Sequence, residues 1–140
     1  MIIDTQTLFS DDQAITATAR STNNVDMGVV AAKAAIGTPE NTVEVLCQVT
    51  ADFDSGADDG TLVVALATDE ALPMDGSSVV LHQTAAIAEA TLVAGYQFSL
   101  GFIPVHAARY LDMNFTVAGS GNFTAGKITA GLVLAKQTNG

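Results

Sequence analysis

The sequence predicts an all-β protein, a jelly-roll-like β-sandwich folded as a single domain. Its 140 residues suffice for one domain with one ordinary core. Apolar and polar residues alternate with a period of two in most segments, as in strands with one buried face. About eight to ten short strands are separated by turn-forming residues, a pattern typical of sandwiches and barrels. Interleaving such strands into two four-stranded sheets gives a jelly roll.

The first 42 residues differ from the rest and predict an N-terminal arm or hairpin followed by a connection. They belong to the same domain as the sandwich core, which we expect at residues 43–140. Strand-like alternation over 2–9 and 13–19 is interrupted by Ser10, Asp11 and Asp12. Residues 21–28 and 34–41 have the composition of extended connections.

The middle of the chain predicts shorter strands joined by loops. Two β-rich runs, 43–50 and 61–68, enclose residues 51–60, whose Asp-Gly ending indicates a long hairpin loop. A further strand is expected at 77–84. Residues 85–94 fit either one helical turn or a short strand followed by a turn.

The last third of the chain carries the clearest alternation. In residues 109–118, Leu111, Met113 and Phe115 alternate with polar neighbours, so one face of this strand is expected in the core. Residues 97–102 and 127–136 follow the same pattern. The glycine-rich residues 119–126 precede a strand and not a helix, which predicts a hairpin connection instead of a phosphate site.

The charge of the chain is concentrated in one part of the sequence. The formal net charge is −10 although 49% of the residues are hydrophobic. Residues 34–108 hold ten acidic residues and no Lys or Arg, while the two ends together hold five acidic and five basic residues, whose charges cancel. We therefore expect acidic loops that face water and neutral surfaces available to neighbours. Five scattered basic residues argue against nucleic-acid binding.

The residue types that usually carry chemistry do not form a recognisable motif. Cys47 shares one side of a predicted strand with three valines, which favours a buried thiol. The two histidines, His82 and His106, lack metal-ligand spacing. We therefore expect no enzyme activity, no cofactor and no metal site. The longest stretch without charged residues, 90–108, is interrupted by Gly and Pro, so no membrane span is expected.

The acidic loop Asp52–Asp59 is the one segment that resembles a metal site. Its Asp-x-Asp start is similar to a calcium loop, but Val63 occupies the position where an EF-hand needs a bidentate Glu. A solvated loop is the favoured interpretation, and the sequence leaves calcium binding open.

Three segments resemble one known family. Residues 1–16, 109–117 and 126–134 resemble the capsid cement (decoration) proteins of tailed phages, typified by that of a short-tailed Bordetella phage. The resemblance covers nearly the whole chain. It implies a jelly-roll sandwich that binds the outer surface of the icosahedral shell in the virion, as a homodimer that contacts the major capsid protein.

Under this resemblance, the N-terminal arm gives a hypothesis for the contact surface. Ile2, Ile3, Leu8 and Phe9 are apolar and lie outside the main sandwich pattern, so they are candidates for a dimer or capsid interface. The alternative is that this segment completes a sheet within its own chain. A ligand- or carbohydrate-binding module is the alternative function, although such sites use exposed aromatic rings and the chain has no Trp.

Overall fold

The computed structural model of the chain describes residues 5–28, 43–74, 76–104 and 107–134, and within them it consists of strands and two short 3₁₀ helices. The elements in chain order are η1 (Thr5–Thr7), β1 (Leu8–Ala14), β2 (Ala19–Arg20), β3 (Val25–Asp26), β4 (Val43–Asp54), β5 (Thr61–Asp69), β6 (Val79–Gln83), β7 (Ile87–Ala88), η2 (Glu89–Thr91), β8 (Gln97–Phe102), β9 (Tyr110–Ala118) and β10 (Ala125–Leu134). The predicted all-β class is confirmed.

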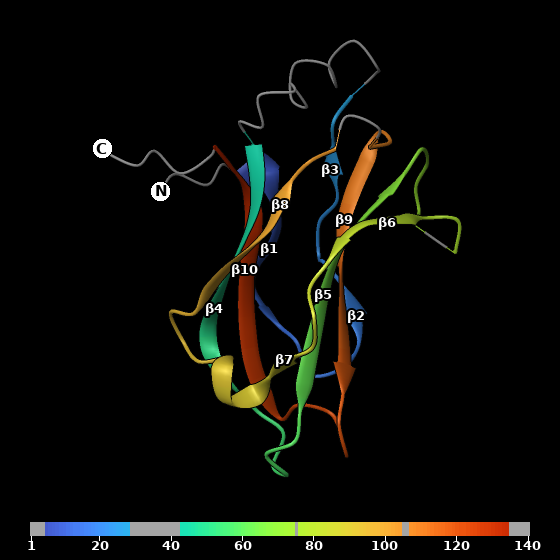
Figure 1. Cartoon of the computed structure of the whole chain (residues 1–140). Helices are drawn as coiled ribbons and strands as arrows, with labels where there is room; N and C mark the ends of the chain where they lie inside the picture. Colours follow the sequence, from blue (N-terminus) through green and yellow to red (C-terminus); the bar gives the residue numbers. More distant parts are fainter. Residues whose placement is uncertain (1–4, 29–42, 75, 105–106, 135–140) are drawn as a thin grey trace.

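Two antiparallel sheets face each other, as Figure 1 shows. The four-stranded sheet has the order β1-β10-β4-β8, and the six-stranded sheet has the order β2-β9-β5-β6, with β3 also on β9 and β7 also on β5. The strand pairs are nested around the β5–β6 hairpin. The β4–β8 pair encloses this hairpin in the sequence, the pairing of β2 and β3 with β9 encloses the β4–β8 pair, and the β1–β10 pair is outermost. Nested pairing split over two sheets is the topology of a jelly roll.

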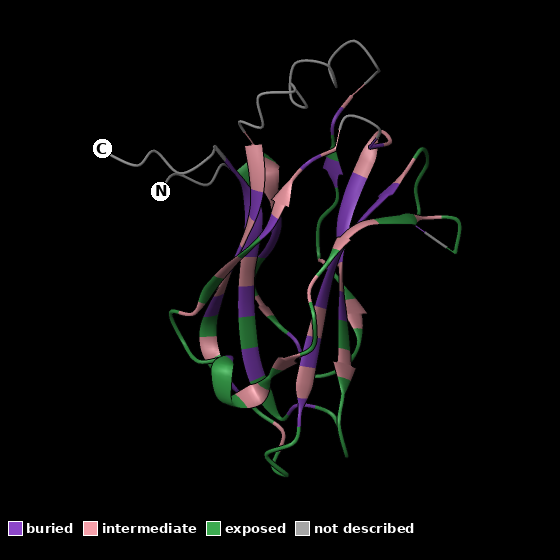
Figure 2. Cartoon of the chain, in the orientation of Figure 1, coloured by how far each residue is buried: buried purple, intermediate pink, exposed green. Residues whose placement is uncertain are grey.

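The hydrophobic core lies between the sheets, and Figure 2 shows buried positions recurring along strands of both. Leu111, Met113 and Phe115 of β9 are fully buried, as their alternation predicts. They face a layer from the four-stranded sheet that includes Cys47 and Ile128. The two sheets therefore bury one face each against the other.

Two predicted hairpins are instead connections between the sheets. Residues 55–60 join β4 to β5, and residues 119–124 join β9 to β10, yet in both cases the two strands belong to different sheets. The hairpin predictions for these segments are therefore wrong. Asp-Gly and Gly-rich turns reverse the chain, but the strands that pair with β4 are β10 and β8, both far away in sequence.

The predicted break at Ser10, Asp11 and Asp12 is also wrong, because β1 runs through it. The register with β10 shifts between Ser10 and Gln13, and Asp12 has a positive φ of 48°, so the acidic residues form an irregularity inside a strand. The Asp12 carboxylate accepts hydrogen bonds from Lys127 Nζ at 2.7 Å and Thr50 Oγ1 at 2.6 Å. These two bonds tie the irregular stretch to the sheet.

The described part of the N-terminal segment is built into the sandwich. β1 is an outer strand of the four-stranded sheet, and β2 and β3 both pair with β9. The connection expected at 34–41 lies outside the described residues. Residues 85–94 contain both alternatives that the sequence offered, the strand β7 followed by the helical turn η2.

Candidate functional site

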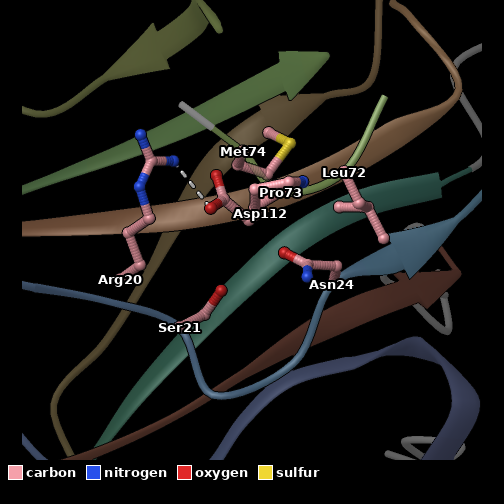
Figure 3. Close-up of a pocket in the computed structure, with 7 residues that line it drawn as sticks. All are labelled: Arg20, Ser21, Asn24, Leu72, Pro73, Met74 and Asp112. Carbon is pink, nitrogen blue, oxygen red and sulfur yellow. Dashed lines mark hydrogen bonds and ion pairs between the residues drawn. The ribbon is translucent and has the colours of Figure 1, made fainter. Parts of the chain in front are cut away.

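A cavity of about 420 Å³ lies beside β9, on the side of the six-stranded sheet away from the core. It is bounded by β2 and the segment after it, by β9, and by the loop between β5 and β6 (Figure 3). Polar side chains form one part of its lining and apolar side chains of the loop form the other. The lining residues are Arg20, Ser21, Asn24, Leu72, Pro73, Met74 and Asp112.

Asp112 is the buried charged group of this cavity. Its side chain is only 1% exposed, and its Oδ2 atom lies 2.8 Å from Nη1 of Arg20, which is 38% exposed. Its other oxygen, Oδ1, is buried and has no hydrogen-bond partner. Burial raises the pKa of the Asp112 carboxyl above its ordinary value, and the Arg20 guanidinium opposes that rise.

Sequence reasoning did not single out Asp112 or Arg20. A polar residue on the outward face of an alternating strand is ordinarily exposed, and Asp112 fits that pattern. It is buried only because the loop after β5 folds towards it and brings Met74, itself a buried residue, into the same cavity lining. No local sequence signal connects Arg20 with a partner 92 positions away.

The second candidate surface is an apolar patch at the end of the same sheet. Val79 and Val80 of β6 are 59% and 53% exposed, and we call these two residues the β6 edge patch. β6 is the last strand of the six-stranded sheet, and the β5–β6 hairpin extends away from the body in Figure 1. Residues 76–88 contain no acidic side chain, although the chain as a whole is strongly acidic. An exposed apolar edge strand of this kind is a potential contact surface.

The four predicted interface residues fall into different environments. Phe9 is fully buried in the core of its own chain, so it is not available to a partner and its place in the hypothesis is corrected. Leu8 is half-buried, on the same strand. Ile2 and Ile3 lie outside the described residues, so the contact hypothesis for them stays a prediction. For residues 8–14 the structure favours the alternative, a strand that completes a sheet of the same chain.

The acidic loop faces solvent, as expected. Asp52, Asp54, Asp58 and Asp59 are all exposed. Three of them hold loops in place, because Asp52 accepts a hydrogen bond from the Ala94 N–H, Asp54 from the Gly56 N–H and Asp59 from Ser120. The Ser120 bonds lower the pKa of the Asp59 carboxyl. Across the described ranges, no three metal-ligating side chains gather in one place.

The histidine and cysteine predictions have separate outcomes. Cys47 is fully buried, as predicted, and burial raises the pKa of its thiol. His82 is half-buried, with Nε2 at 2.8 Å from the Phe102 carbonyl oxygen, so it connects β6 to β8 of the other sheet. His106 lies outside the described residues.

Fold and surfaces together define a jelly-roll β-sandwich protein with an apolar strand edge and a surface cavity lined by the Arg20–Asp112 ion pair. Residues 9–132 match the model of the Bbp16 family, and the chain belongs to that family. The family name is consistent with a Bordetella phage protein and suggests a phage origin for this chain. A comparison with curated proteins finds no match. Within the described ranges, no helix has the length and hydrophobicity to cross a bilayer.

Proposed function

We propose that the protein is a capsid cement protein, which binds the outer surface of an icosahedral phage shell and stabilises it. The observation that carries this proposal is the match of residues 9–132 to the Bbp16 family, together with the resemblance to the Bordetella phage cement protein. A protein that contacts two shell subunits adds binding free energy, and these contacts must break before the two subunits can separate. Many copies on one shell multiply the effect.

The proposed active form is a homodimer that bridges major capsid subunits. A two-fold dimer presents the same surface twice and so fits equivalent neighbours in a shell. The β6 edge patch supports such a dimer, since two copies of β6 can pair antiparallel and bury Val79 and Val80. Two chains of charge −10 repel each other, and the repulsion is weakest where residues 76–88 carry no acid.

Carbohydrate or ligand binding is the less supported alternative. Carbohydrate sites stack sugars on exposed aromatic rings, and both tyrosines already have contacts within the chain. The rings of Tyr96 and Phe98 lie 5.7 Å apart, and the Arg109 guanidinium lies 4.9 Å from the Tyr110 ring centre.

The test of the proposed function is a comparison of virions with and without this protein. Mass spectrometry of purified virions should find the chain. Virions that lack it should release DNA at a lower temperature, and adding the purified protein should restore heat resistance. If the protein is absent from virions, or if heat resistance does not depend on it, the proposal is wrong.

A double variant and a matched control test the proposed dimer surface. Replacing Val79 and Val80 with Ser should leave stability within about 0.5 kcal/mol but shift the mass measured by ultracentrifugation towards the monomer. Val93→Ser is the matched control, because Val93 is 48% exposed but follows η2, outside the β6 edge patch. An unchanged mass for the Val79 and Val80 variant would exclude the β6 edge patch as the dimer surface.

The arm hypothesis needs a truncation that spares the core. Removing residues 1–9 would delete Phe9, which is a core side chain, and would confuse folding with binding. Removing residues 1–4 takes away both Ile2 and Ile3 and leaves Phe9 in place. Unchanged dimer mass and unchanged shell binding after this truncation would end the hypothesis for the arm.

A further inference from the structure

We propose that the peptide bond between Asp59 and Gly60 is a site of spontaneous isomerisation to isoaspartate, which contacts with Ser120 and Glu89 hold back in the folded protein. Aspartate followed by glycine is the sequence most prone to this reaction, because glycine has no side chain to obstruct the attack of its nitrogen. Asp59 is exposed in the segment 55–60 that joins β4 to β5, so its carboxyl group is open to water.

The reaction takes place within the chain and needs only water. The Gly60 nitrogen loses its proton and bonds to Cγ of Asp59, and the carboxyl hydroxyl leaves as water, which closes a succinimide ring. Water then adds to one of the ring carbonyl groups and breaks its bond to the nitrogen. Opening at the original backbone carbonyl gives isoaspartate, whose backbone is one methylene longer and whose mass is unchanged.

The first restraint is the contact of Ser120 with the reacting carboxyl group. Oδ2 of Asp59 accepts hydrogen bonds from the Ser120 N–H at 3.0 Å and from the Ser120 hydroxyl. These bonds fix the orientation of the group and stabilise its ionised form, which lowers the pKa of Asp59. A carboxylate has no hydroxyl to lose, so the ionised form is a poor partner for the Gly60 nitrogen.

The second restraint acts on the attacking nitrogen. The Gly60 N–H donates to Oε2 of Glu89 and to Oγ of Ser55, both at 3.3 Å. Glu89 is itself held in place, because its carboxylate also accepts hydrogen bonds from the N–H and the hydroxyl of Ser55, at 3.1 and 2.5 Å. The nitrogen must give up its hydrogen before it attacks, so the reaction loses both of its hydrogen bonds.

The packing around the peptide also opposes the longer backbone of the product. Gly60 is buried, and a Cβ added to it would lie 2.5 Å from the Phe123 ring. Gly119 lies against the same peptide, since a Cβ added there would be 3.0 Å from the Asp59 carbonyl oxygen and 3.1 Å from Gly60 Cα. An extra methylene would have to displace one of these neighbours. The fold therefore keeps this bond in its original form, and unfolding exposes it to the reaction.

The experiment compares the folded chain with the same chain unfolded in urea, incubated at the same neutral pH and temperature. Protease digestion and mass spectrometry with electron-transfer fragmentation count isoaspartate at Asp59, since this fragmentation distinguishes the two isomers. The unfolded chain should react about tenfold faster or more, because one charge-assisted hydrogen bond is already worth about that factor. Asp75 also precedes a glycine, and in the unfolded chain it is the positive control for the readout.

Variants assign the protection to the two contacts. Ser120→Ala removes the hydroxyl bond and should raise the rate at Asp59 in the folded chain about tenfold. Ser99→Ala is the matched control, since it removes a hydroxyl bond of 3.2 Å to the Glu44 carboxylate on β4 and should leave the rate unchanged.

Glu89→Gln distinguishes a restraint from a base. The amide is a weaker acceptor for the Gly60 N–H, so the rate should rise about threefold. A lower rate would mean that Glu89 takes the proton and promotes the reaction, which would overturn its assigned role. Urea denaturation of each variant shows whether a faster reaction comes from the local contact or from a larger unfolded fraction.

The comparison of folded and unfolded chains uses the unaltered protein, so it decides the proposal even if a variant fails to fold. Equal rates at Asp59 in the two states would overturn it, and so would a reaction at Asp75 without one at Asp59 in urea. Unchanged rates in both folded variants would show that Ser120 and Glu89 do not protect the bond. A phage shell takes no part in this experiment, so its result is independent of the proposed function.

Discussion

The two ends of the β5 strand differ in how tightly their surroundings are packed. At its start, Gly60, Phe53, Phe123 and Gly126 form a tightly packed group that we call the closed end. At its finish, β5 leads to the cavity and to the β6 edge patch, where valines are exposed and a buried carboxylate oxygen lacks a partner. The closed end is tightly packed, whereas the β6 side has exposed apolar surface and a buried carboxylate oxygen without a hydrogen-bond partner. The contrast predicts that substitutions at the closed end cost stability and that substitutions at the β6 edge patch do not.

Geometry explains why the closed end tolerates little change. The rings of Phe53 and Phe123 meet edge to face, with centroids 4.9 Å apart. A Cβ added at Gly60 would lie 2.5 Å from the Phe123 ring, and one at Gly126 would collide with the Phe53 ring. Glycine at these two positions therefore allows the backbone to approach the aromatic pair.

The largest expected effect is the loss of an aromatic ring from the closed end. Phe53→Ala removes a ring that is 5% exposed and should lower the free energy of unfolding by about 4 kcal/mol, measured by urea denaturation. Val80→Ala, a truncation in the β6 edge patch, should change it by less than about 0.5 kcal/mol. Similar losses at both positions would break the contrast between the two regions.

The next effect comes from adding one methyl group to the closed end. Gly126→Ala should cost about 3 kcal/mol, because it combines the collision with Phe53 and a positive φ of 137°. Gly95→Ala separates the two causes, since Gly95 has a φ of 92° but nothing within 4 Å of the added Cβ. It should cost about 1 kcal/mol in the same denaturation experiment. Equal costs would mean that backbone conformation alone explains the effect.

A smaller and pH-dependent effect is expected at the cavity. Arg20→Ala leaves the Asp112 carboxylate buried without a counter-ion and should cost about 2 kcal/mol at neutral pH. The pKa of Asp112 is already raised by burial, and removing Arg20 raises it further. The folded state then binds a proton more readily than the unfolded state, so the cost disappears as the pH falls towards the ordinary value of 3.8.

The double variant checks this assignment. With Asp112→Asn already present, Arg20→Ala should have little further effect, because no buried charge remains to be neutralised. An equal loss of stability in both backgrounds would mean that Arg20 acts through some other contact.

The smallest effect is expected at the exposed pair of Asp26 and Arg109. Two hydrogen bonds of 2.8 Å from Arg109 lower the pKa of the Asp26 carboxyl to about 2. Asp26→Asn should therefore reduce stability above pH 3.8, and the difference from the unaltered protein should vanish as the pH falls through about 2. The difference should also shrink when salt is added to a denaturation series at pH 7. A difference that persists in high salt would indicate a packing role for Asp26.

The predicted strands and their buried faces were mostly correct, and the predicted connections were less so. β9 and β5 begin and end within about one residue of their expected bounds, because alternation marks both the strand and the face that turns inward. The segments at 51–60 and 119–126 were misassigned, because turn residues specify a change of direction but not the strand that comes next in the sheet. Phe9 was misassigned because an apolar residue next to an acidic segment looks the same whether its partner is β10 or another molecule.

The sequence by itself determined the all-β class, the inward faces of the strands, the buried Cys47 and the exposure of the acidic loop at 52–59. These properties depend on residues that are neighbours in the chain, and period-two alternation is enough to express them. Only the tertiary structure decided that Asp112 is buried, that Arg20 is its partner and that the exposed valines lie on an edge strand. The reason is physical: strand pairing and loop packing bring together residues tens of positions apart, and a local pattern carries no information about such contacts.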